Sequence, residues 1–343
     1  MRAARLLSGA SSLHILDVPM PEPIGDAIRV RVIGAGVCHS DLHVLDGAFA
    51  EMVHRPVTLG HEIAGVVDAT GPDASDLEIG TPVVVMVGWG CGSCAWCVAG
   101  HEQLCPSGVE AGSHVDGGFA EHILVPHRRH VVPLGRIDPL DATPFGCAAL
   151  CAYAAVRRVQ PRLSGGGSLA VIGAGGLGQH AIHYARQLTG AQVVAIDPRS
   201  TALVGALAAG AHVALEPGTV TPSLVQEVTH GLGCQAVLDF VGSDESLALA
   251  ATLVGRQGII ALLGLAGGTL SFGFDTLAAE ATITTVVAGT IRDLHDVVRL
   301  AQQDRYAIAL TTYPLDAVNV ALADLRAGLI DGRAVVIPGD SGR

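Results

Sequence analysis

A glycine-rich turn between a predicted strand and a predicted helix is the feature that most constrains how this chain can fold. Residues 169–172 read Leu-Ala-Val-Ile, typical of a buried strand, and run directly into Gly-Ala-Gly-Gly-Leu-Gly at 173–178. A helix is predicted over 177–188, and Asp197 stands at the end of the next apolar run. The order strand, turn, helix, strand and acid predicts a binding site for the phosphates of a dinucleotide.

Each glycine of this turn has an expected task. Gly173 allows the tight reversal, Gly175 lets a pyrophosphate approach the backbone, and Gly178 lets the helix pack against the strand. Asp197 can accept hydrogen bonds from the adenosine ribose and would repel a 2′-phosphate, which favours NAD over NADP. Arg199 weakens that preference slightly, because a guanidinium at this position can reach a 2′-phosphate.

From about residue 148 onward, apolar runs of strand length alternate with helix-like stretches. This alternation predicts parallel strands joined by helices, in a doubly wound sheet with helices on both faces. The predicted strands are 169–173, 192–196, 213–215, 236–240, 259–263 and 283–287, and the predicted helices are 177–188, 201–209, 222–229, 245–254 and 270–279.

The first 145 residues follow a different pattern, in which short apolar runs are interrupted by Gly and Pro. This pattern predicts an antiparallel, loop-rich β structure. After residue 289 we expect two helices, at 293–303 and 315–327, and a closing strand at 333–337. The early runs that carry the β prediction are 28–33, 63–68, 81–87 and 119–125.

Length and composition agree with two compact domains. The chain has 343 residues, of which 50% are apolar and 15% charged, and its formal net charge is −12. With few and scattered basic residues, a nucleic-acid or anionic-membrane partner is not expected. Neither a membrane-spanning run nor a signal peptide is predicted, so we expect a cytoplasmic protein. The expected domains are 1–147 with 289–343, and 148–288.

Four cysteines occur within fifteen residues, with the spacing Cys91-x2-Cys94-x2-Cys97-x7-Cys105. Four thiolates on tight turns are typical of a closed, tetrahedral, structural zinc site. A redox pair would use two cysteines, and the residues between these four are not the lysines and arginines of a nucleic-acid-binding zinc ribbon. The sequence therefore predicts a structural zinc ion.

A second polar cluster, Gly-Val-Cys-His-Ser-Asp-Leu-His at 36–43, follows the predicted strand at 28–33. We expect it at the strand end or on the turn beyond, where a polar surface loop is the alternative reading. Cys38 in this cluster, His61 in Gly-His-Glu and Cys147 offer two thiolates and one imidazole. That donor set, with one open position, is typical of a catalytic zinc site.

These motifs, in this order and spacing, resemble the zinc-dependent medium-chain alcohol dehydrogenase family over essentially the whole chain. The resemblance extends to Val-Leu-Asp-Phe-Val-Gly at 237–242 and to the closing segment 332–338. It implies a Rossmann-type NAD-binding domain at 148–288. It also implies a mostly β, GroES-like catalytic domain formed by 1–147 and 289–343.

The resemblance also implies a set of metal ligands. Cys38, His61 and Cys147 match the ligands of the catalytic zinc, and Glu62 matches a carboxylate behind it that in some members approaches the metal. Cys151 lies four residues from Cys147 and competes with it as the third ligand, and some close relatives use an acidic residue there. Cys91, Cys94, Cys97 and Cys105 match the structural site, so two zinc ions per chain are implied.

Proton-transfer and cofactor residues follow from the same resemblance. Ser40 and His43 match a proton relay, and Asp41 matches a carboxylate that orients the ligand histidine. His39 and Arg333 match cations near the pyrophosphate. The remaining implied cofactor contacts are Cys151 beside the nicotinamide, Gly173, Gly175, Gly176, Leu177, Gly178, Asp197, Arg199 and Val241.

The implied activity is reversible hydride transfer between a primary or secondary alcohol and NAD, with zinc activating the substrate oxygen. Phe49, Val87 and Trp89 are candidates for lining the substrate pocket, which favours an apolar substrate over a polyol. A polyol or amino-alcohol dehydrogenase is the alternative within enzymes, and a non-catalytic NAD-binding zinc protein is the alternative outside them. The resemblance implies a homodimer or homotetramer that pairs along the edge strand near 283–287.

Overall fold

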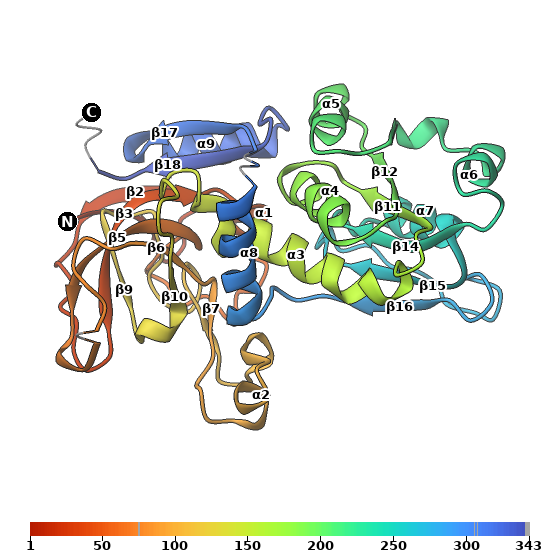
Figure 1. Cartoon of the computed structure of the whole chain (residues 1–343). Helices are drawn as coiled ribbons and strands as arrows, with labels where there is room; N and C mark the ends of the chain where they lie inside the picture. The colour runs from red at the N-terminus through yellow and green to blue at the C-terminus, as the bar shows by residue number, and fades with distance from the viewer. Residues whose placement is uncertain (75, 305, 307, 340–343) are drawn as a thin grey trace. The chain divides into compact units, whose positions relative to one another are not determined.

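The computed structural model describes residues 1–74, 76–304, 306 and 308–339 (Figure 1). The chain divides into two compact units. The first unit, formed by Met1–Leu150 and Ala288–Arg343, is mostly β, and the second, Cys151–Val287, alternates strands and helices. The α/β fold class predicted from the sequence is confirmed.

The first unit is built around a sheet in the order β10-β6-β5-β3-β18-β17, with β9 also paired to β3. Most pairs are antiparallel, while β17 and β18 are parallel. Alternate residues of β3 are buried, as expected for a strand with one face on a core. The strands are β3 (Ile28–Gly36), β5 (Glu62–Thr70), β6 (Pro82–Val85), β9 (His122–Val125), β10 (Val131–Pro133), β17 (Leu310–Pro314) and β18 (Arg333–Ile337).

Two smaller sheets complete the β structure of this unit. One has the order β2-β1-β4, with the N-terminal strand β1 in its centre, and the other is a ribbon of β7 and β8. Their strands are β1 (Arg2–Leu6), β2 (Leu13–Asp17), β4 (Val57–Thr58), β7 (Gly88–Trp89) and β8 (Val109–Glu110).

Helices of the first unit are short, apart from one after the second unit. They are α1 (His39–Leu45), α2 (Ala95–Val98), α8 (Ile291–Gln303) and α9 (Val318–Arg326), with 3-10 turns η1 (Pro72–Ala74), η2 (Glu102–Leu104), η3 (Arg128–His130), η4 (Thr143–Gly146) and η7 (Leu315–Ala317). Helix α3 (Ala148–Val159) follows η4 and leads into the second unit. The 3-10 turn η5 (Gln160–Arg162) comes directly after this helix.

The second unit contains one parallel sheet in the order β13-β12-β11-β14-β15-β16. Since crossovers between parallel strands are right-handed as a rule, this strand order puts α4 and α5 on one face and α6 and α7 on the other. The strands are β11 (Ser168–Ile172), β12 (Gln192–Ile196), β13 (Val213–Leu215), β14 (Cys234–Asp239), β15 (Val254–Leu262) and β16 (Thr282–Thr285). The helices are α4 (Gly176–Leu188), α5 (Ser200–Ala208), α6 (Pro222–Val228) and α7 (Asp244–Leu253), and η6 (Pro217–Thr219) precedes α6.

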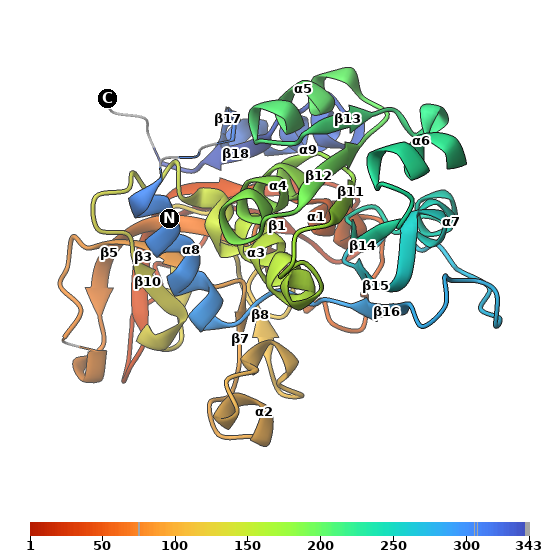
Figure 2. The same ribbon diagram turned by 45° about the vertical axis from the view of Figure 1, so that its right-hand side comes forward.

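One predicted helix, 270–279, is wrong. Residues 263–281 are all described and contain no helix, and Figure 2 shows this segment looping out beside β15 and β16. Gly267, Gly268 and Gly273 lower its helix propensity, and the side chains of Phe272 and Phe274 are exposed rather than packed.

No helix within the described residues is both long and apolar enough to cross a membrane. Each unit has its own buried apolar core. Phe119 and Leu59 belong to the core of the first unit, and Ile196 and Val237 belong to that of the second.

Candidate metal and dinucleotide sites

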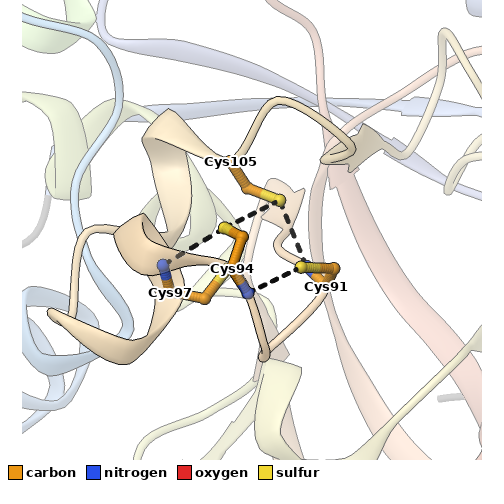
Figure 3. A group of neighbouring side chains, drawn as sticks. All are labelled: Cys91, Cys94, Cys97 and Cys105. Atoms are coloured by element: carbon orange, nitrogen blue, oxygen red, sulfur yellow. Dashed lines mark hydrogen bonds between the residues drawn. The ribbon is translucent and has the colours of Figure 1, made fainter.

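The four clustered cysteines converge on one point of a lobe that carries α2 and η2 (Figure 3). Their sulfur atoms lie within 4.8 Å of one another, and those of Cys94 and Cys105 are 3.8 Å apart. Backbone N–H groups of Cys91, Cys94 and Cys97 donate to the sulfurs of Cys105, Cys91 and Cys94 at 3.4, 3.4 and 3.5 Å. All four thiols are free, so the lobe has no disulfide.

The electrostatics of this lobe suit a cation. Hydrogen bonding from the backbone and hydroxyl of Ser93 lowers the pKa of Cys91 to about 6. Desolvation, together with hydrogen bonds to the neighbouring thiols, raises the pKa of Cys97 to about 12, because both disfavour its thiolate. A divalent metal stabilises the thiolate form, and four thiolates make a closed tetrahedral zinc site. The residues present fit a structural zinc ion.

A second donor group lies inside the first unit and is fully buried. It contains Cys38, His61, Glu62 and Cys147, whose ligand atoms lie within 4.8 Å of one another. Cys38 follows β3 and caps α1, His61 and Glu62 stand at the start of β5, and Cys147 follows η4. Cys147 is therefore in this group, while Cys151 lies four residues further on, in the second unit.

The cluster at 36–43 is not a turn, because most of it forms helix α1. Asp41 accepts hydrogen bonds from the N–H groups of Cys38 and Gly60, at 2.9 and 3.2 Å, and lies 3.7 Å from Nδ1 of His61. Its carboxylate thus ties together the two segments that supply a thiol and an imidazole. This arrangement supports ligand histidines in many metal sites.

Ser40 and His43, the predicted proton-relay residues, lie on α1 beside the buried donors. The hydroxyl of Ser40 lies 3.7 Å from the sulfur of Cys38. His43 is three residues further along, on the same helix face, and its ring makes an edge contact with Phe49 at 6.3 Å. His39 is exposed at the helix start.

An ion pair that the sequence analysis missed lies against the buried donors. Nε of Arg333 donates to Oε2 of Glu62 at 2.8 Å, and a second guanidinium nitrogen contacts Oε1. Both side chains are buried. A Cβ at Gly36 would lie 2.2 Å from the Glu62 carboxylate, so only glycine fits there. Arg333 was predicted to face the cofactor pyrophosphate, and in this structure its guanidinium binds Glu62.

Charges in this group favour the binding of a cation. A hydrogen bond from the Cys147 thiol, aided by the charges of Arg333 and His61, holds the pKa of Cys38 well below its usual value against the effect of burial. Burial disfavours a charged imidazole, yet Asp41 and Cys38 raise the pKa of His61 well above its usual value. The protons held here are the ones that a metal ion displaces from a thiol and an imidazole. Two thiols and one imidazole fit a catalytic zinc ion with one open position.

In the second unit, the glycine-rich turn joins β11 to α4. Gly173 has a φ of 86° and donates its N–H to Ile196 at 2.9 Å, and Gly175 is the N-cap of the helix. A Cβ at Gly178 would lie 2.0 Å from the carbonyl oxygen of Gly173, so the helix can approach the turn only with glycine there. Gly176 and Leu177 form the first helical turn.

Asp197 stands just after β12, at the position predicted for a ribose-binding acid. Its Oδ2 accepts the N–H of Ala174 at 2.9 Å, and its Oδ1 accepts the backbone and Nε of Arg199 at 2.9 and 3.2 Å. The carboxylate of Asp197 therefore fixes the position of the glycine-rich turn through its hydrogen bond with Ala174. Val241, at the end of the neighbouring strand, approaches Gly173 and is positioned by a 2.8 Å hydrogen bond from its N–H to Asp239. The role of Asp239 was not predicted.

The three residues predicted to line the substrate pocket lie in different surroundings. Phe49 is exposed, while Val87 and Trp89 are buried. The indole of Trp89 donates to the carbonyl of Met86 at 2.9 Å and stacks on His130. It also lines an apolar cavity of about 420 Å³, and none of the lining residues belongs to either donor group.

Fold and donor groups together define a class: a dinucleotide-binding α/β unit joined to a β unit with two thiolate-rich metal sites. Two protein-family models match the chain. One, described as "Alcohol dehydrogenase GroES-like domain", matches residues 25–136, and the other, described as "Zinc-binding dehydrogenase", matches residues 176–303.

Individual proteins resemble the chain over nearly its whole length. An NAD-dependent alcohol dehydrogenase of Sulfurisphaera tokodaii is 34% identical, covering 98% of this chain and 100% of the relative. D-arabinose 1-dehydrogenase (NADP(+)) of Saccharolobus solfataricus is 33% identical, covering 98% and 97%. Among solved structures, the alcohol dehydrogenase of Aeropyrum pernix superimposes with a TM-score of 0.92 at 33% identity, covering 98% and 100%.

The chain belongs to the zinc-dependent medium-chain alcohol dehydrogenase family. The predicted family is therefore confirmed, together with its fold, a GroES-like unit and a Rossmann-type unit.

Proposed function

We propose that this protein is an NAD-dependent zinc alcohol dehydrogenase. It would transfer a hydride reversibly between the carbinol carbon of a primary or secondary alcohol and NAD. The observation that carries the proposal is the buried group of Cys38, His61 and Cys147, which suits a catalytic rather than a structural metal. Relatives named NAD-dependent alcohol dehydrogenase, at 34% and 32% identity over the full length, support the same activity.

Cys38, His61 and Cys147 would hold the catalytic zinc, and the four cysteines of the lobe would hold the structural one. A zinc ion at the first site supplies a Lewis acid that makes an alcohol hydroxyl more acidic. Glu62 is engaged by Arg333, so its task is to place a compensated negative charge behind the donors. Asp41 would position His61 and the segment that carries Cys38.

Proton transfer would be the task of Ser40 and His43. The hydroxyl of Ser40, beside the sulfur of Cys38, would accept the proton that leaves the substrate hydroxyl. His43, on the same face of α1, would pass it toward solvent, since an imidazole titrates near neutral pH. In the reverse direction the same groups would return the proton to the carbonyl oxygen.

The cofactor would bind the second unit through its glycine-rich turn. We propose that Gly173, Gly175, Gly176, Leu177 and Gly178 receive the pyrophosphate at the N-terminus of α4, beside Val241. Asp197 would favour NAD, and Arg199 would moderate the preference. His39, Cys151 and Arg333 remain proposed cofactor contacts. The domains would divide as predicted, with catalytic residues in 1–147 and 289–343 and the cofactor on 148–288.

We also propose a homodimer or homotetramer in the cytoplasm. β16 is the last strand in its sheet, and Ile283 on it is exposed, so this edge suits pairing with a second copy across a two-fold axis. All eight cysteines are free, and four of them form one cluster, which suits a reducing compartment.

A polyol or sugar dehydrogenase is the second candidate, because a relative named D-arabinose 1-dehydrogenase is 33% identical over the full length. A non-catalytic NAD-binding zinc protein is less well supported, since Cys38, His61 and Cys147 are all present and lie together.

The test combines metal counting with NADH formation. We expect two zinc ions per chain, and turnover of a small primary or secondary alcohol with NAD. One zinc ion per chain and no turnover on primary, secondary or polyhydric alcohols would refute the proposal. Turnover with NADP alone would refute the role given to Asp197.

A further inference from the structure

Glu110 ends the second strand of the β7–β8 ribbon. Gly88 pairs with Glu110, and Trp89 pairs with Val109. Because neighbouring residues of a strand point to opposite faces, Trp89 and Val109 share one face and Glu110 points from the other. Trp89 and Val109 line the apolar cavity. A Cβ at Gly88 would meet no described atom within 4 Å, so the ribbon face that carries Glu110 borders open space.

Both strands of this ribbon connect to the buried donor group. The N–H of Val87 donates to the carbonyl of Gly146 at 3.2 Å, one residue before Cys147. Two residues after Glu110, a Cβ at Gly112 would lie 3.0 Å from the nitrogen of Gly60, one residue before His61. Glu110 is therefore held between the segments that supply a thiol and an imidazole.

The backbone around Glu110 is fixed by hydrogen bonds. Its carbonyl accepts the N–H groups of Ser113, His114 and Val115 at 3.4, 3.1 and 3.4 Å. Its own N–H donates to Nδ1 of His114 at 3.2 Å, and the hydroxyl of Ser113 contacts the same ring nitrogen at 3.1 Å. The carboxylate is thus presented from a rigid support.

The carboxylate itself has no hydrogen bond or ion pair within the part of the chain that the structure describes. Glu110 is half-buried, and desolvation raises its pKa, with His61, Cys38 and Asp41 close enough for their charges to act on it. It is not one of the grouped metal donors. A half-buried carboxylate that no protein group engages leaves its oxygens available as acceptors, and a ligand that donates a hydrogen bond can occupy them.

We propose that Glu110 is a specificity-determining residue, whose carboxylate accepts a hydrogen bond from a second donor group on the alcohol substrate. The donor is a hydroxyl or an ammonium on the carbon next to the carbinol. This inference rests on the proposed alcohol dehydrogenase function and deepens it by naming the substrate class. It replaces the apolar substrate expected from the sequence with one that carries a vicinal polar group.

Three alcohols of matched size test the proposal: 1-amino-2-propanol, 1,2-propanediol and 2-butanol. They present an ammonium, a hydroxyl and a methyl group at the same position. The zinc-loaded protein is assayed at neutral pH, by kcat/KM with NAD and, independently of turnover, by calorimetric affinity without cofactor. The variants are Glu110→Leu and the closer mimic Glu110→Gln, and the control is Glu78→Gln, at an exposed glutamate elsewhere in the same unit.

We expect the wild type and Glu78→Gln to prefer at least one donor-bearing compound over 2-butanol by about ten- to a hundredfold, the range of a charge-assisted hydrogen bond. Glu110→Leu should lose that preference. Glu110→Gln should lose more with the ammonium than with the hydroxyl compound, because it keeps an acceptor but not the charge. The compound preferred by the wild type identifies the donor.

Two further outcomes separate this inference from the proposed function. Equal ratios among the three alcohols in the wild type and Glu110→Leu, in both rates and affinities, would overturn the inference while leaving an active dehydrogenase. No NADH from any alcohol, with an affinity preference that Glu110→Leu abolishes, would refute the proposed activity while supporting the role of Glu110.

Discussion

The two donor groups of the first unit use similar atoms in opposite surroundings. The lobe gathers four thiols at the surface, joined by sulfur-accepting hydrogen bonds from its own backbone. The buried group has two thiols and one imidazole, with Asp41 on one side and the Glu62–Arg333 pair on another. A closed set of thiolates stabilises a fold, whereas a buried, incomplete set leaves a position for chemistry.

The largest expected effect is the loss of activity when the buried donor group, and not the lobe, loses its metal. Cys38→Ser should reduce kcat/KM by about 10⁴-fold, because loss of the catalytic metal removes several kcal/mol of transition-state stabilisation. It should leave the lobe metal in place, so metal analysis should give one zinc ion per chain. Activity within tenfold of the wild type would contradict the assignment of the buried group.

Next in size is the buried ion pair. Arg333→Met leaves the Glu62 charge buried without a partner and should cost about 3–5 kcal/mol in the free energy of unfolding. Denaturant unfolding of the metal-free protein measures this without a contribution from zinc. The double variant Glu62→Gln, Arg333→Met should recover most of the loss, and failure to do so would mean that the cost lies in packing rather than in charge.

Removing one cysteine from the four-cysteine lobe should lower the stability of the protein more than its catalytic activity. Cys94→Ser should release one zinc ion and lower the stability by about 3 kcal/mol, since loss of a structural metal is among the larger single-site effects. Calorimetric melting and limited proteolysis between residues 91 and 105 measure this. The matched control, Cys234→Ser, alters a buried cysteine outside both groups and should keep both zinc ions.

The smallest effect, taken per pH unit, concerns the base of the lobe, where His130 stacks on Trp89. Burial, aided by Arg129 and His127, lowers the pKa of His130 to about 3. Between the usual value near 6.5 and about 3, the unfolded chain binds more protons than the folded one, so stability falls as the pH falls. The slope from this residue should reach at most about 1.4 kcal/mol per pH unit.

Denaturant unfolding of the metal-free protein at pH values from 7 to 4 tests this pH dependence, with His130→Phe as the comparison. The variant keeps an aromatic ring and should have the shallower slope. Equal slopes would show that His130 does not stay neutral in the folded chain.

Much of the second unit could be predicted from sequence because its signal is periodic and local. The strands 192–196, 213–215 and 333–337 coincide with β12, β13 and, in the first unit, β18. Helix α3 was missed because it is rich in alanine and largely buried, so it lacks the polar face that reveals a helical period. The helix predicted at 270–279 is wrong for the opposite reason, because Phe272 and Phe274 are exposed rather than packed on a core.

The same distinction between local and distant signals applies to the residues of the candidate sites. Motifs with short spacing, such as the four cysteines and the glycine-rich turn, could be predicted because all their members lie within a few turns of chain. The Glu62–Arg333 pair joins residues 271 positions apart, so no local sequence pattern predicts it. Glu110 was missed because a single carboxylate forms no sequence motif. Only the β7–β8 ribbon shows that it is held between the segments of the buried donor group.

The pairing of β18 with β3 has a consequence for how the molecule is made. During synthesis, β3 emerges early, together with Cys38, His61 and Glu62. β18 follows only after the whole second unit. At about 5–20 residues per second, the interval is about 15–60 s. Until then Glu62 lacks the guanidinium that pairs with it, and Ala35 and Gly36 of β3 lack their β18 partners, so this part of the sheet closes only after the whole second unit has been made.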